Sequence, residues 1–219
     1  MQVTGNFTYL LIALIGFLIL TALQAEYPIL GEGYFLGFAF EATLIIGIWS
    51  IVHVRKWFSL GMTLVVISMI GFLLQQLAGL RWAEYLNMLA ILLFYSLTTI
   101  LAFKAMMTGN EINSNKIMGS ICVYLLVGIS WGILYYLEFR LNPEAFRGLG
   151  AGNQQDTVLD LLYYSYVTIS TLGYGDITPI SPVARTLAYI EALFGQFYIA
   201  ILVAGFVGLG LTRGNRSQS

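Results

Sequence analysis

The sequence predicts an all-α membrane protein with six transmembrane helices and one re-entrant segment. Of its 219 residues, 58% are hydrophobic and only 10% are charged, and the mean hydropathy is +0.82. Soluble domains carry about a quarter charged residues. Six long apolar runs each hold at most one charge, and a seventh is shorter and ends in a glycine-rich stretch. A single cysteine and a net charge of -1 exclude a disulfide scaffold and a nucleic-acid-binding protein.

The six long runs match the length that a bilayer requires, since a hydrocarbon core of ~30 Å takes ~20 apolar residues as a helix. The predicted spans are residues 1–25, 33–54, 57–80, 85–103, 117–137 and 186–212. The second contains Glu41 and the last contains Glu191. We interpret the first as a retained helix rather than a signal peptide, because no Lys or Arg precedes its apolar stretch.

An even number of crossings places both termini on one side of the membrane. The basic residues predicted on that side are Arg55, Lys56, Lys104, Lys116, Arg213 and Arg216. Those predicted on the other side are fewer, and acids outnumber them there. The excess of basic residues favours cytoplasmic termini in a plasma (inner) membrane. The re-entrant segment, between the fifth and sixth spans, then opens to the outside.

The re-entrant segment is a short helix followed by irregular backbone. Residues 161–175 carry no charge but are too few to cross the membrane. We predict a helix over residues 157–170, with Asp156 as its N-cap. The C-terminus of such a helix carries roughly -0.5 of a charge, which stabilises a cation in the middle of the membrane. Irregular backbone at that depth is tolerated where it is buried in protein or lines a water-filled cavity.

The irregular part, residues 171–175, contains two glycines that alternate with larger residues. Glycine adopts positive φ without a Cβ clash, so successive carbonyls can turn toward the same side. If several chains faced one axis, these carbonyls would form stacked rings of oxygen that replace the water shell of a cation.

Residues 171–176 read TLGYGD, which resembles the potassium-channel signature TVGYGD with Leu172 in place of Val. The resemblance runs from about Lys116 to the end of the chain. It implies a homotetrameric pore, in which three identical subunits complete each ring. It also implies K⁺ ions in the filter and no organic cofactor. The residues that the resemblance assigns to ion binding are Thr171, Leu172, Gly173 and Tyr174 as K⁺ ligands, and Gly175 at the outer mouth.

The resemblance also assigns residues that support the filter. Asp176 would anchor behind it by bonding to the pore helix. Tyr163 and Tyr164 stand where many family members have paired tryptophans, and Thr168 is assigned to the same support. Val167 stands where some members have a glutamate that partners the aspartate. We therefore expect a different set of bonds around Asp176.

Four further residues are candidates for gating or for structural roles in the spans. Gly195 stands at the position of the family's hinge glycine. Glu191 is a candidate filter-gating acid, and a bond to the pore helix or to a neighbouring subunit is an equal alternative. Gln196 is expected to face the cavity below the filter. For Glu41 we favour a structural role over a functional one, although intramembrane acids are often functional.

The chain divides into a four-helix bundle at residues 1–108 and a pore domain at residues 109–219. The bundle resembles a voltage sensor without its charges, because the fourth span contains no arginine. Each charge moved across 100 mV contributes only ~2.3 kcal/mol, so steep gating needs several. We expect no intrinsic voltage sensing of this kind. Constitutive conduction, filter gating, and control by lipid, tension, pH or a separate regulatory partner remain open.

The expected function is passive, K⁺-selective conduction through the membrane. One alternative is a weakly selective cation channel, for which changes at Tyr174 or Gly175 would be the sign. Another is a non-conducting auxiliary subunit with a channel-like fold, which an intact segment 171–175 argues against. An enzyme is not expected, since no span pairs a nucleophile with a base. The expected partners are sister subunits and membrane lipids, and no nucleic acid is expected.

Overall fold

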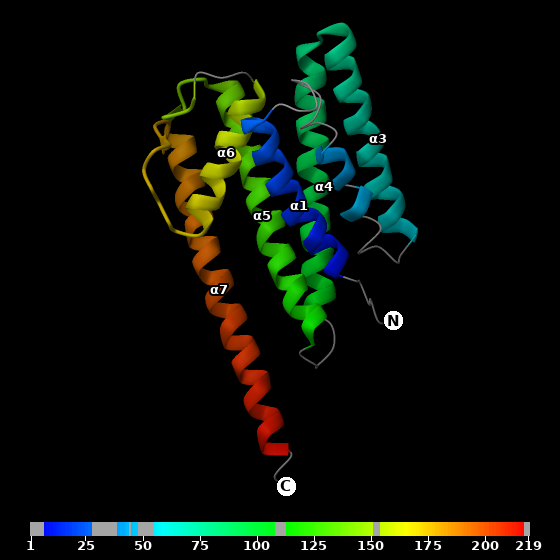
Figure 1. Ribbon diagram of the computed structural model, residues 1–219, viewed down its shortest axis with the longest axis vertical. Coiled ribbons are helices and arrows are strands. Elements are labelled where there is room, and N and C mark those ends of the chain that lie inside the picture. Colours follow the sequence, from blue (N-terminus) through cyan, green and yellow to red (C-terminus); the bar gives the residue numbers. More distant parts are fainter. Residues whose placement is uncertain are drawn as a thin grey trace.

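A computed structural model describes residues 7–27, 39–43, 45–47, 55–107, 113–150 and 154–216 (Figure 1). The described part of the chain is mainly helical. The helices are α1 (Phe7–Glu26), α3 (Arg55–Ala78), α4 (Arg81–Met107), α5 (Ser114–Leu141), α6 (Gln154–Ile169) and α7 (Pro182–Arg216). Two short antiparallel strands pair with each other: β1 (Phe146–Arg147) precedes α6, and β2 (Thr178–Pro179) follows the segment after α6.

Five of the helices are long and apolar enough to cross a membrane. The stretches concerned are Phe7–Gln24, Trp57–Ala78, Arg81–Met106, Ser114–Leu141 and Pro182–Gly205. They correspond to five of the six predicted spans. Most of the predicted second span, residues 33–54, lies outside the described residues, but residues 39–43 and 45–47 within it are helical. Glu41 is buried there, and its carboxylate accepts a hydrogen bond from the Ser68 hydroxyl at 2.6 Å.

Several helices begin earlier than their apolar runs indicate, because polar residues cap or extend them. The Asn113 side chain accepts a hydrogen bond from the Lys116 N–H at 2.9 Å at the start of α5. At the start of α7, Ser181 Oγ accepts the Ala184 N–H at 3.0 Å. Pro182 then occupies the first helical position, where its missing N–H costs nothing. The last span therefore begins at Pro182 rather than at residue 186.

The first turn of α4 contains a charged residue that is buried in the helical bundle. Glu84 is buried, yet it forms an ion pair with Arg140 of α5 at 2.7 Å and accepts the Tyr136 hydroxyl at 2.8 Å. A buried carboxylate is tolerated when a cation and additional hydrogen bonds compensate for its lost hydration. These contacts fasten α4 to α5 near the end of the bundle.

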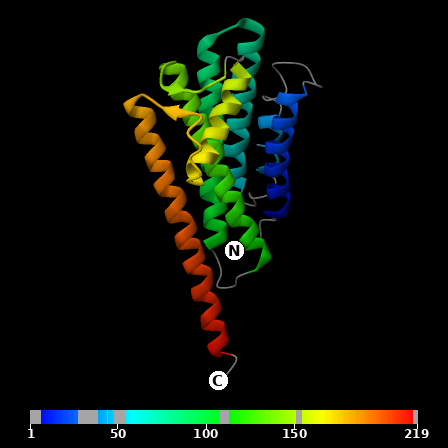
Figure 2. The same ribbon diagram turned by 60° about the vertical axis from the view of Figure 1, so that its left-hand side comes forward.

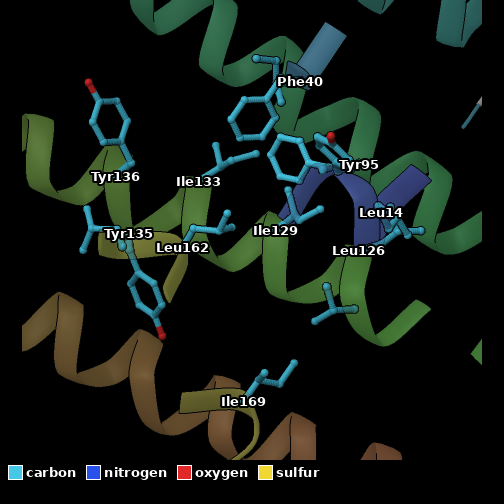
Figure 3. Packing of buried hydrophobic residues seen from close by; sticks show 14 of the residues in the cluster. Leu14, Phe40, Tyr95, Leu126, Ile129, Ile133, Tyr135, Tyr136, Leu162 and Ile169 are labelled. Carbon is cyan, nitrogen blue, oxygen red and sulfur yellow. The ribbon is translucent and has the colours of Figure 1, made fainter. Parts of the chain in front are cut away.

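One continuous hydrophobic core joins the first helices to the pore helices. It includes Leu14 of α1, Tyr95 of α4, Ile129 of α5 and Ile169 at the end of α6 (Figure 3). Helix α6 is a short helix that lies between α5 and α7 (Figures 1 and 2). Helix α7 diverges from the bundle and runs past the ends of the other helices (Figure 2). The division at residue 108 stays a prediction.

Candidate ion-binding filter

The filter segment follows α6, and glycines in α5 bring α6 close. A Cβ atom at Gly132 would lie 2.9 Å from the Leu162 side chain, and a Cβ at Gly128 would meet the Tyr166 ring. The Tyr166 hydroxyl reaches past Gly128 and donates to the Leu125 carbonyl at 2.9 Å. Because these two glycines have no side chains, Tyr166 and Leu162 of α6 can pack directly against the backbone of α5.

The start of α6 differs from the prediction. The helix begins at Gln154, so Asp156 lies in its first turn and is not its N-cap. The apolar pattern could not place this start, since the first turn consists of polar residues. An acid in the first turn still interacts favourably with the partial positive charge of a helix N-terminus.

The backbone of the filter alternates in conformation. Thr171, Gly173 and Gly175 have φ values of 57°, 59° and 79°, whereas the residues between them keep negative φ. The positive φ predicted for the two glycines is therefore present, and Thr171 joins them. The N–H groups of Leu172 and Gly173 both donate to the Val167 carbonyl, at 3.0 and 3.3 Å. These bonds turn the chain sharply out of the last turn of α6.

The filter is open to its surroundings within a single chain. Leu172 is 56% exposed and Tyr174 is 67% exposed. In the described part of the chain, no donor forms a hydrogen bond to the carbonyl oxygens of residues 171–175. The segment therefore presents a run of backbone oxygens with free lone pairs, which suits the binding of a hard cation.

Thr171 has a left-handed conformation that is uncommon for a residue with a Cβ atom. Its N–H donates to the Thr168 carbonyl at 2.9 Å, and its hydroxyl oxygen accepts a hydrogen bond from Gln196 Nε2 at 2.9 Å. Gln196 thus lies beside the start of the segment 171–175. The sequence suggested a position below the filter for Gln196 but not this bond.

Asp176 directly follows the filter and is hydrogen-bonded to a residue of the pore helix. The Tyr163 hydroxyl donates to Asp176 Oδ2 at 2.7 Å. This hydrogen bond lowers the pKa of Asp176 and raises the pKa of Tyr163 to about 12, because it favours the carboxylate and the protonated phenol. Val167 takes no part in it.

Gly148 also contacts this region, and sequence reasoning missed its role. Its φ is 90°, and a Cβ atom there would overlap the carbonyl oxygen of Asp176. The backbone of the loop before α6 therefore passes directly over the residue that ends the filter. The only signal in the sequence is the cluster of glycines in that loop.

Tyr164 packs inside an aromatic cluster behind the pore helix, unlike the exposed Tyr163. Its ring centroid lies 4.9 Å from that of Tyr135 and 5.5 Å from that of Phe146. The cluster joins α5, α6 and β1, so the pore helix is packed from behind by rigid rings. Thr168, further along α6, is half-buried.

Gly195 lies where α7 passes the end of α6. A Cβ atom there would overlap the Ile169 carbonyl oxygen. Helix α7 is continuous through this residue. The glycine at this position thus permits close packing between the last span and the pore helix.

Glu191, one turn earlier on α7, is fully buried. Its carboxyl oxygens lie 2.5 Å from the Tyr135 hydroxyl and 2.5 Å from Ser165 Oγ. Of the two alternatives that the sequence left open, the bond to the pore helix is the one present. Tyr135, which is far from Glu191 in the sequence, was not anticipated as its partner.

Comparisons with known proteins agree with this geometry. Residues 121–209 match a family described as ion channel, and they cover α6, the filter and most of α5 and α7. The two-pore potassium channel 5 of Arabidopsis thaliana is 34% identical over 85 residues, which is 39% of this chain and 18% of the relative. Two-pore potassium channel 2 of the same plant is 34% identical over 100 residues, 46% of this chain and 21% of the relative.

A bacterial protein is also similar. The inward rectifier potassium channel Kirbac3.1 of Paramagnetospirillum magnetotacticum is 43% identical over 86 residues, 35% of this chain and 29% of that protein. The chain thus spans about a fifth to a third of the length of these relatives. Helices of this length and apolarity make the protein an integral membrane protein. Through residues 121–209, with their TLGYGD segment and the short helix α6, the chain is similar to the potassium channel family.

Proposed function

We propose that the chain forms a homotetrameric channel that conducts K⁺ passively and selectively. The observation that carries the proposal is the alternation of positive φ at residues 171, 173 and 175. Alternating handedness along a strand lets successive carbonyls point to one side. Rings of such carbonyls replace the hydration shell of K⁺ in selectivity filters.

The exposure of the filter supports assembly around a shared axis. Polar backbone without hydrogen-bond partners is not tolerated against lipid, so another surface or a water-filled pore must meet residues 171–175. Of the five spans that the structure describes, α7 is the least buried, with 11% of the residues in Pro182–Gly205 buried against 28–56% in the other four. Four copies around the filter would cover the inner side of α7 and complete each ring of ligands.

The pore helix supports cation binding at the inner end of the filter. Helix α6 ends at Ile169, two residues before Thr171. The partial negative charge at a helix C-terminus stabilises a cation close to it. Four such helix ends, one from each subunit, would point at the ion that waits below the filter.

Helix α4 of the bundle contains few charged residues. The charged residues of that helix are Arg81, Glu84 and Lys104, and Glu84 is already paired with Arg140. We therefore propose that gating does not depend on arginines that cross the field. We also propose cytoplasmic termini and a plasma (inner) membrane location, which the distribution of Lys and Arg supports.

Reversal potentials of the purified chain in a planar bilayer test the function. With K⁺ on one side and Na⁺ on the other, we expect the current to reverse far from zero, toward the K⁺ equilibrium potential. A reversal near zero would instead indicate the weakly selective cation channel. An absence of current, with protein shown to be inserted and folded, would indicate the non-conducting auxiliary subunit.

A further inference from the structure

The carboxyl group of Glu191 lies where neither lipid nor a second subunit can touch it. The residue is 0% exposed within a single chain. Arg140 pairs with Glu84, and no Lys or Arg of the described residues forms an ion pair with Glu191. An ionised carboxylate buried without a cation is strongly unfavourable, especially at membrane depth.

The hydrogen bonds around this carboxyl can be counted. Ser165 Oγ lies 2.7 Å from the Gly128 carbonyl oxygen and 2.5 Å from Glu191 Oε1. A hydroxyl has one hydrogen, and a carbonyl oxygen and a carboxylate oxygen can only accept. An ionised Glu191 would therefore leave two acceptors competing for one hydrogen at Ser165.

A proton on Glu191 Oε1 resolves the conflict. Glu191 then donates to Ser165 Oγ, and Ser165 donates to the Gly128 carbonyl. Glu191 Oε2 accepts from the Tyr135 hydroxyl at 2.5 Å. Each of the three contacts then holds one hydrogen, and every group uses the donor and acceptor capacity it possesses.

The other titratable groups that face Glu191 bring no positive charge. Among the described residues, the titratable groups that interact electrostatically with Glu191 are tyrosines: Tyr124 and Tyr135 of α5, and Tyr164 and Tyr166 of α6. In Figure 3 the Tyr135 ring leaves α5 with its hydroxyl directed toward α7, on the side where Glu191 lies. The surroundings of Glu191 therefore favour a neutral acid over a carboxylate.

The chain of bonds crosses three helices at the back of the pore helix. It runs from the Gly128 carbonyl and Tyr135 of α5, through Ser165 of α6, to Glu191 of α7. Ser165 precedes Thr171 by less than two helical turns. One turn further along α7, Gly195 packs on Ile169 at the end of the same helix. These contacts fix where α6 ends and thus where the filter begins.

We propose that Glu191 is a neutral carboxylic acid that acts as a positioning residue, clamping the pore helix between α5 and α7. The role in conduction rests on the proposed K⁺ channel function. The clamp is distinct from any direct contact with the ion, since Glu191 acts on the filter through Ser165.

The proton makes a specific prediction about amide and apolar replacements. In Glu191→Gln, the side-chain NH₂ can donate to Ser165 and the carbonyl can accept from Tyr135, as the neutral acid does. Glu191→Leu has a similar volume but leaves both hydroxyls without that partner.

Infrared difference spectra of the purified full chain test the proton directly. We expect wild type minus Glu191→Gln to show the carbonyl stretching band of a protonated, water-excluded carboxylic acid. Glu84→Gln is the matched control, because Glu84 is also buried but is paired with Arg140. Its difference spectrum should show the loss of carboxylate bands instead. A carboxylate signal in the Glu191→Gln difference would overturn the proposal.

Liposome K⁺ flux tests the clamp. We expect Glu191→Leu to lower K⁺ flux about tenfold or more, and Glu191→Gln to lower it severalfold less than Glu191→Leu does, on the scale of a lost buried hydrogen bond. Equal losses in the two variants would overturn the clamp. Absence of flux in the wild type would overturn the K⁺ channel function alone. In that case thermal unfolding tests the clamp. A lower unfolding temperature for Glu191→Leu than for Glu191→Gln supports it, and equal unfolding temperatures overturn it.

Discussion

At the residue scale, three positions with positive φ present different energetic problems. Gly173 and Gly175 adopt this region freely, whereas Thr171 carries a Cβ atom that is crowded there. Thr171 keeps this conformation while its N–H and its hydroxyl oxygen are both hydrogen-bonded. Backbone strain of this kind persists only where surrounding contacts over-determine it. The filter is thus held by its neighbours as well as by its own residues.

Gly173→Ala is expected to lower K⁺ selectivity and conductance, because alanine at a φ of 59° is disfavoured by about 1–2 kcal/mol. Gly79→Ala is the matched control. Gly79 has a φ of 63° in the loop between α3 and α4, and a Cβ atom at either glycine would meet nothing within 4 Å. The two variants should lose similar stability, but only Gly173→Ala should change the single-channel current. Equal currents in both would contradict the filter geometry.

Gln196→Leu is expected to release the Thr171 hydroxyl, since it removes the donor at 2.9 Å while it keeps a similar volume. The inner end of the filter should then bind cations less well. A hydrogen bond of this kind contributes about 0.5–1.5 kcal/mol, which corresponds to a few-fold change in affinity. Block by Ba²⁺ from the inner side, or K⁺ occupancy by isothermal titration, would measure it. An unchanged affinity would show that Gln196 does not act on this site.

At the element scale, the pore helix is held from three directions. Helix α5 contacts it closely at Gly128 and Gly132, and α7 contacts it at Gly195. On a third side, its own Tyr163 is hydrogen-bonded to Asp176 after the filter. Glycine at a helix–helix contact lets backbones approach closely, which is a common device in membrane proteins.

Gly128→Ala should therefore shift or expel the Tyr166 ring from α5. Overpacking a close contact costs about 1–3 kcal/mol. We expect a lower unfolding temperature and reduced K⁺ flux. Gly16→Ala on α1 is the control, because a Cβ atom there would meet nothing within 4 Å. Equal stability of the two variants would show that α6 is not seated as described.

Tyr163→Phe removes the donor that lowers the pKa of Asp176. Because the pKa is lower in the folded state, the bond contributes stability above the unfolded pKa of Asp176. That contribution is lost as the pH falls through the folded value. The variant should be less stable than the wild type at neutral pH, and the difference should vanish in acid. Thermal unfolding of both proteins across pH measures it, and a difference that persists in acid would contradict the assignment.

At the scale of the whole molecule, α4 and α7 have opposite surroundings. Helix α4 packs between α3 and α5 and fastens to α5 by an ion pair, whereas α7 leaves the bundle with most of its surface uncovered (Figure 2). In the proposed channel, the first arrangement suits a static support for the pore, and the second suits contact with other subunits.

We expect the open probability of the channel to depend only weakly on voltage, because α4 offers no row of arginines to move in the field. Each charge displaced across 100 mV would contribute ~2.3 kcal/mol. Bilayer recordings over a wide voltage range would measure the effective gating charge. A steep conductance–voltage curve would place a voltage sensor elsewhere in the molecule.

The amino-acid sequence alone determined the five described apolar spans, the short helix before the TLGYGD segment, and the two glycines of positive φ in that segment. These features are local: hydropathy belongs to each residue, and glycine has the same φ freedom in any fold. The polar starts of α4, α6 and α7 were placed less well, because charged and polar first turns have no apolar pattern.

Only the tertiary structure decided which side chains meet. Asp176 bonds to Tyr163, and Thr171 bonds to Gln196. Glu191 bonds to both Tyr135 and Ser165. Gly195, which stands at the position of the family's hinge glycine, lies in close contact with Ile169. Such contacts depend on the rotation of each helix about its axis and on the depth at which helices cross. Those quantities arise from packing the whole bundle, so no single stretch of sequence contains them.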